Sequence, residues 1–370
     1  MKKIVIIVII FSFLCVPEVV KGEDILKIDD YDLEAVQETL DESEYKEIDF
    51  KEMIELIISG KSNTVITDTL SYIVEKAIGE INLGREYIIN IIMIALLSSL
   101  FTNFGNVFSG SGVSDTGFYI CYIAIMSIAL IIYSGAIDIA VELLQLIVEF
   151  MQALIPAFFL SVGMIGQASA LGFYQITLAT ITVVEFISLK IVIPAIKIYL
   201  VIAVANNISK EDLLSKSIEL IKKGIMFVNK TTLGLVVGIN IVQGMVLPHV
   251  DGVKNSAIKK LAGAIPVIGD TSEYVTDVFL NSGMLIKNSL GTAAIIILIC
   301  VCAIPILKIL LTKLSIQLSV AVIQPVADKR IVESMGNISD ALELMIRTLM
   351  TSVYLFVLSI AIVCIMTNIN

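Results

Sequence analysis

The sequence has few of the residues on which enzyme sites and water-exposed surfaces are built. Among its 370 residues there is one histidine, there is no tryptophan, and Asp, Glu, Lys and Arg together make up 16%. A single histidine excludes the His-Glu-x-x-His pair of a metalloprotease, and no Cys/His zinc pattern is present. Soluble domains are about 25% charged, so the shortage of charge excludes an ordinary soluble fold.

The five cysteines do not indicate a metal site. Cys300 and Cys302 are two residues apart, which separates their side chains by about 200° around a helix. They therefore do not converge on a metal ion. All five lie in apolar runs, and we interpret them as small buried hydrophobic residues. We expect neither a metal nor a cofactor.

Motifs that resemble catalytic or nucleotide-binding signatures are each incomplete. An intramembrane serine protease requires Gly-x-Ser-Gly, but residues 109–112 read Ser-Gly-Ser-Gly. An intramembrane aspartyl protease requires Gly-x-Gly-Asp, and Val267 replaces its first glycine. Residues 60–62 would end a phosphate-binding loop, but Glu55 stands where that loop needs a glycine. We therefore expect no enzymatic activity.

What the sequence does contain is a series of long apolar runs. Hydrophobic residues make up 57% of the chain, and its mean hydropathy is +0.94. These values predict an all-α, polytopic membrane protein with about six or seven spans, some of them broken, re-entrant or amphipathic. The main runs are 88–104, 118–137, 172–204, 225–247, 291–311 and 348–366.

The N-terminus has the order of a secretory signal. Two lysines precede an apolar run over residues 4–14, and Pro17 and polar residues follow it. That run is short for a membrane span. We predict a signal peptide over residues 1–22, with an uncleaved anchor as the alternative.

All of the net negative charge lies in the region that follows. Residues 23–55 hold fourteen acidic and three basic side chains, while the rest of the chain holds 21 acidic and 22 basic. We predict an acidic exported region over residues 23–85 with one or two short helices, ahead of a membrane domain over residues 86–370. A solvated tail and a region docked on a basic extracytoplasmic partner remain alternatives.

One apolar segment carries a regular set of polar residues. They recur at steps of four, three, four and three, which places them on one narrow side of a helix ending near Pro156. We call them the polar seam: Asp138, Glu142, Gln145, Glu149 and Gln152. A carboxylate at mid-membrane costs about 2.5–3.5 kcal/mol, so we interpret the seam as lining a cavity or contacting a partner. The alternative is a helix half-submerged at the membrane surface, although such helices usually carry Lys and Arg.

Two further charges, Glu185 and Lys190, lie inside the run 172–204, which Pro194 is expected to break. Their five-residue gap separates them by about 140° around a helix, so a mutual ion pair is not expected. We predict polar contacts to other helices, and a transport site is the alternative. His249 follows Pro248 in a predicted loop and is interpreted as incidental.

The segment Gly263–Asp270 is apolar yet carries two glycines and a proline. It is therefore predicted to be a broken apolar turn at Gly263, Pro266, Gly269 and Asp270. Between membrane spans, such a turn is tolerated only where protein or a water-filled cavity surrounds it. Asp270 is also expected to cap the helix that follows.

The order of these features resembles stage III sporulation protein AE of endospore-forming bacteria, from about residue 60 to the end. Besides the acidic exported region, the matching segments are Leu154-Ile155-Pro156 before Gly163–Gly172, the basic pair Lys259-Lys260, Ala264–Gly269, and Leu285-Ile286-Lys287-Asn288.

The resemblance implies a protein made in the mother cell and placed in the outer forespore membrane, with its acidic region extracytoplasmic. There it would join other membrane proteins and a forespore partner in a channel or secretion-like complex that supports forespore development. It implies no catalytic residues. We expect membrane proteins and the bilayer as partners, a homo-oligomer as an open option, and no nucleic acid. The alternative is a stand-alone permease or secondary transporter, which predicts two similar halves with matched broken helices.

Overall fold

The computed structural model of the chain describes residues 33–75, 89, 92–93, 111–164, 170–208, 213–262, 269–325 and 327–366. Helices are the regular elements throughout these ranges, and no strand occurs in them. The all-α prediction is therefore confirmed. The predicted signal peptide, almost all of the run 88–104, and Gly263 and Pro266 lie outside the described residues.

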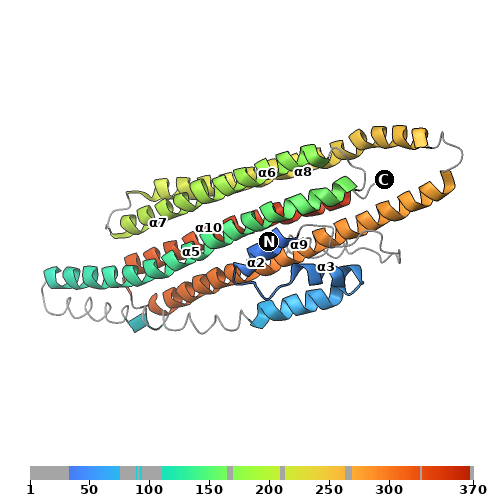
Figure 1. The fold of residues 1–370 in the computed structure, drawn as a ribbon. Coiled ribbons are helices and arrows are strands. Elements are labelled where there is room, and N and C mark those ends of the chain that lie inside the picture. Colours follow the sequence, from blue (N-terminus) through green and yellow to red (C-terminus); the bar gives the residue numbers. More distant parts are fainter. Residues whose placement is uncertain are drawn as a thin grey trace.

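The long helices run side by side in an elongated bundle, and the short N-terminal helices lie against its side (Figure 1). A helix over residues 62–75 follows the first two short ones. The elements are α2 (Glu34–Asp41), α3 (Phe50–Ile58), α5 (Ser111–Met164), α6 (Ala170–Phe186), the π-helix η2 (Ile187–Val192), α7 (Ile193–Ile208), α8 (Ser215–Ala262), α9 (Gly269–Ile323) and α10 (Lys329–Met366).

Five segments in the described ranges are long and apolar enough to cross a membrane. They are Phe118–Ser161, Gln175–Ile208, Ser215–Val242, Leu285–Ile323 and Lys329–Ala361. The prediction of a polytopic membrane protein is confirmed. Each segment is 28 to 44 residues long, whereas about 20 residues suffice to cross the hydrocarbon core. The helices therefore tilt strongly or continue beyond the bilayer.

Helix α10 forms the centre of the bundle. It packs against α5, α7, α8 and α9, and the apolar part of its span is 72% buried. The span of α8 is the outermost, because only 22% of its apolar part is buried. Burial thus falls from α10 towards α8, which leaves most of the α8 surface to lipid or to other proteins.

The structure corrects several helix boundaries that proline and glycine had led us to expect. Residues 111–117, the predicted span 118–137 and the seam helix form one helix, α5, with Pro156 inside it. Helix α8 continues through Pro248 and His249, so the histidine is not in a loop. Packing along these apolar helices outweighs the local preference of proline and glycine to end a helix.

Gly291 marks the closest approach of α9 to α10 and α5. A Cβ atom there would collide with the Cys364 sulfur, lie 3.3 Å from the Phe158 ring, and lie 3.6 Å from Ile360. A side chain at this position would therefore overpack a fully buried contact.

We predict that Gly291→Val destabilises the bundle, because overpacking a closely fitted core costs about 1–3 kcal/mol. The matched control is Gly238→Val on α8, where nothing lies within 4 Å of the added Cβ. The measurement is the thermal unfolding midpoint of each purified variant in detergent. Equal midpoints for the two variants would show that the three helices do not meet as described.

Candidate functional site

The structure places all five seam residues on one exposed side of α5. Asp138, Glu142, Gln145, Glu149 and Gln152 are exposed, and the first and last of them are 14 positions apart, or about 21 Å along the helix axis. The positions between them are buried against the bundle: Ala140, Leu143, Leu144, Ile147, Val148 and Met151. The seam is therefore on the outside of the described bundle and not inside it.

The helix that carries the seam is an integral part of the bundle. Helix α5 packs against α2, α6, α9 and α10, and the whole seam lies within the apolar segment Phe118–Ser161. The carboxylates point away from these neighbours, so none of these four helices gives them polar surroundings.

The exposed side of α5 changes character along its length. Before the seam it carries Ile120, Ile123 and Ile131, whose exposed fractions are 65%, 63% and 67%. From Ser134 through Gln152 the exposed side is mainly polar. The apolar part before the seam is suited to contact with lipid, whereas the polar part from Ser134 to Gln152 is not.

Glu185 lies just before the π-helix η2, and Lys190 lies within it. Glu185 is half-buried at the end of α6, and Lys190 is exposed within η2. In this part of the described chain, no ion pair joins Lys190 to Glu185 or to a seam carboxylate. The π-helix accommodates Pro194, because the Ile193 amide donates to the Ser188 carbonyl five residues back.

Of the predicted broken turn, only the end is described. Gly269 and Asp270 are the first two residues of α9, so Asp270 lies inside the helix rather than capping it. Helix ends are defined only to within one or two residues. The turn before them stays a prediction.

The acidic N-terminal region packs onto the bundle through an apolar side. Helix α2 contacts α5 and helix α3 contacts α9, and the rings of Phe50 and Phe150 meet edge to face at 6.3 Å. The buried residues are Val36, Leu40, Phe50, Met53, Ile54 and Ile57. Their helical spacing was visible in the sequence, but packing on the chain's own bundle was neither of the two alternatives, a solvated tail and docking on a basic partner.

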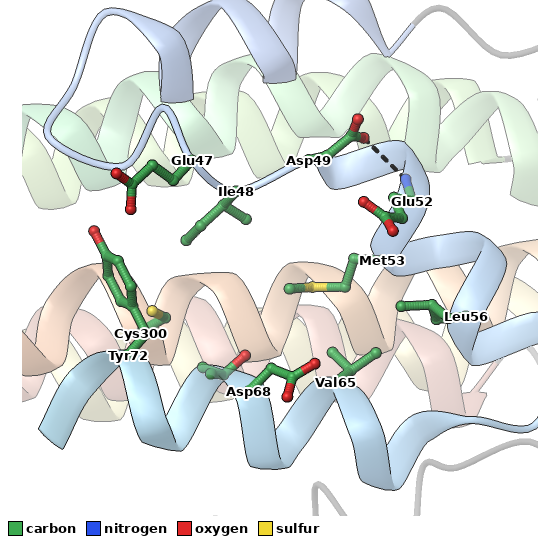
Figure 2. Close-up of a pocket in the computed structure, with 11 residues that line it drawn as sticks. Glu47, Ile48, Asp49, Glu52, Met53, Leu56, Val65, Asp68, Tyr72 and Cys300 are labelled. Atoms are coloured by element: carbon green, nitrogen blue, oxygen red, sulfur yellow. Dashed lines mark hydrogen bonds between the residues drawn. The ribbon is translucent and has the colours of Figure 1, made fainter. Parts of the chain in front are cut away.

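A cavity of about 270 Å³ lies between this region and α9 (Figure 2). Its lining combines four carboxylates with apolar side chains: Glu47, Asp49, Glu52 and Asp68 with Ile48, Met53, Leu56, Val65, Tyr72 and Cys300, besides Thr69. Asp49 also caps α3, because its carboxylate accepts a 2.9 Å hydrogen bond from the Glu52 amide. Within the described residues no group of three or more His, Cys, Asp or Glu side chains could hold a metal ion.

The sequence profile of the stage III sporulation protein AE family matches residues 48–367. The chain belongs to this family. The stage III sporulation protein AE of Bacillus subtilis (strain 168) is 26% identical over 262 residues, which are 70% of this chain and 65% of that relative. The chain thus spans just under two thirds of the relative's length. No solved structure matches.

Membership of the stage III sporulation protein AE family confirms the predicted resemblance and assigns the chain to sporulation as a membrane protein. The family match begins inside the acidic region, two residues before α3. It therefore includes α3, the cavity lining apart from Glu47, the seam and all five candidate spans.

In this family member, hydrogen bonds between polar side chains join α8 to α10 at two levels of the bundle. On α8, Asn229 donates to Thr348 at 3.0 Å and Asn240 donates to Ser359 at 2.7 Å. The two pairs are both 119 residues apart, so α8 and α10 run parallel and in register. They hold the least buried span to the central helix.

A second polar contact joins α9 to the end of α10. Lys287 is fully buried, and its ammonium donates to the Cys364 carbonyl at 3.4 Å. A cation near the C-terminal end of a helix is favoured by the helix dipole and by the carbonyls without helical partners. The sequence had marked Lys287 only as part of the family resemblance.

We predict that Asn240→Leu destabilises the association of α8 with α10 by about 0.6–1.7 kcal/mol, the range for hydrogen bonds between membrane helices. Thr231→Leu, at an exposed position of the same helix, is the control and should have no effect. The measurement is the free energy of unfolding of each variant in mixed detergent micelles, compared with that of the unchanged protein. An unchanged value for Asn240→Leu would contradict the role given to this pair.

Proposed function

We propose that the chain is a non-enzymatic membrane subunit of a channel or secretion-like complex that links mother cell and forespore and is required for forespore development. By this proposal it resides in the outer forespore membrane, with the acidic region extracytoplasmic. The observation that carries the proposal is the polar seam, which is exposed on a membrane-spanning helix and carries three carboxylates.

The energy of the seam argues against a chain that stands alone in lipid. Each carboxylate at mid-membrane costs about 2.5–3.5 kcal/mol, so three would cost about 8–10 kcal/mol. This is comparable to the whole net stability of a typical domain, about 5–15 kcal/mol. A partner subunit or a water-filled passage removes that cost, and a multi-subunit complex supplies either.

The charge of the seam also bears on the kind of partner. A two-fold contact between identical seams would bring Glu142 and Glu149 of two copies together, and like charges oppose such a contact. The seam is better suited to a different membrane protein that offers hydrogen-bond donors or cations, or to a ring of subunits around water. A stand-alone transporter is less favoured, because Glu185 and Lys190 are joined neither to each other nor to the seam in the described structure.

The test replaces Glu142 and Glu149 together by Leu. We expect normal membrane insertion and accumulation, a fall in heat-resistant spores of at least a hundredfold, and loss of the partner membrane proteins from the purified complex. The matched control is Gln175→Leu with Thr182→Leu on α6, where both side chains are also exposed within a span. The control variant should sporulate normally.

A third variant separates charge from polarity. Glu142→Gln with Glu149→Gln keeps hydrogen-bonding groups and removes both charges, so normal sporulation of this variant would assign the seam to hydrogen-bonded packing. Normal sporulation of the Leu variant, with its partners retained, would refute the proposed role of the seam.

A further inference from the structure

The α9 span contains an interior proline, Pro305, just after its most buried stretch. Pro305 has no amide hydrogen, so it cannot donate to the carbonyl of Val301 four residues earlier. Val301 is 3% exposed, and its segment has the highest hydropathy of the described spans. Lipid cannot supply the missing donor at such a position.

The donor comes from the acidic N-terminal region. The hydroxyl of Tyr45, in the turn between α2 and α3, donates to the Val301 carbonyl at 2.8 Å across 256 residues of sequence. Tyr45 is 3% exposed. Burial raises the pKa of Tyr45, so the hydroxyl stays protonated and remains a donor throughout the physiological range.

Other contacts fix Tyr45 in place. The side chain of Gln37 donates to the Ile48 carbonyl at 3.1 Å and accepts from the Phe50 amide at 2.9 Å, which ties α2 to the start of α3 around the turn. Close to Pro305 along α9, the Lys308 ammonium lies 3.7 Å from the Glu44 carboxylate. The turn is thus tied to α2 and α3 by the Gln37 hydrogen bonds, and the Lys308–Glu44 ion pair links it to α9.

The prolines at 156 and 194 are accommodated differently. Pro156 leaves the carbonyl of Gln152 without its helical partner, and this residue is on the exposed side of α5. Before Pro194 the helix widens into η2, within its own segment. Among these three prolines, Pro305 depends on a donor from a separate element.

We propose that the N-terminal region is a releasable clamp on the Pro305 break of α9, with Tyr45 as the positioning residue. When the clamp is docked, the Val301 carbonyl is paired and α9 is held in one shape. When the clamp is released, that carbonyl has no partner and α9 bends at Pro305 to expose or satisfy it. Docking or release of the N-terminal region is thereby coupled to the shape of α9. This coupling does not involve the polar seam.

The first test is a double-mutant cycle on the full-length protein in nanodiscs, read by amide hydrogen exchange over residues 34–58. Tyr45→Phe removes only the hydroxyl, and we expect about a tenfold rise in exchange, the size of one lost buried hydrogen bond. In a Pro305→Ala background the new amide can pair with Val301, so the same change should raise exchange less than about twofold. Tyr72→Phe is the control, since its hydroxyl makes a long, exposed contact of 3.5 Å to the Glu44 carbonyl.

An equal effect of Tyr45→Phe in both backgrounds would overturn the link between Tyr45 and the proline break. So would an effect of Tyr72→Phe as large as that of Tyr45→Phe, because it would show a general loosening of the region.

The second test asks whether release matters. Pro305→Ala gives α9 a continuous hydrogen-bond ladder, so the protein should accumulate normally, exchange more slowly over residues 298–310, and yield at least tenfold fewer heat-resistant spores. Wild-type spore yield with slower exchange would overturn the proposal of a releasable clamp. The Leu variants of the seam should leave exchange over residues 34–58 unchanged, which separates failure of the clamp from failure of the seam.

Discussion

A polar group inside an apolar helix must find its partner within the protein or at a wet surface, because hydrocarbon offers none. The main features of this bundle follow from that constraint. The Val301 carbonyl, freed by Pro305, is paired by Tyr45 from the acidic N-terminal region. The asparagines of α8 pair with hydroxyls of α10. The seam carboxylates are turned outward, where the described part of the chain gives them no shelter.

The same constraint explains why the N-terminal region is part of the fold. Its apolar side covers α5 and α9, and the buried Tyr45 hydroxyl pairs a carbonyl of a membrane helix, while its acidic side chains from Glu34 to Glu75 are exposed. A region that looked like a separate exported tail is therefore also a structural element of the membrane bundle. This arrangement brings the acidic region into direct contact with α9.

Two surfaces of the bundle are suited to contacts with other proteins. The seam offers carboxylates along one side of α5, and the N-terminal region offers an acidic cavity beside α9. Both surfaces are negative, and neither is covered by the described residues. A membrane protein with two such surfaces is better suited to work within an assembly than alone, which supports the proposed role in a complex between mother cell and forespore.

Composition and periodicity alone determined the membrane class, the helical fold and the shared face of Asp138 to Gln152, because hydropathy and residue spacing are local properties. They misplaced helix ends at Pro156 and Pro248, since a proline's local cost is outweighed by packing along the whole helix. Spacing gives the angle of a side chain around its own helix but not which neighbours cover it. Only the tertiary structure decided that the seam faces outward and that Tyr45 meets Val301, because both depend on elements far apart in the chain.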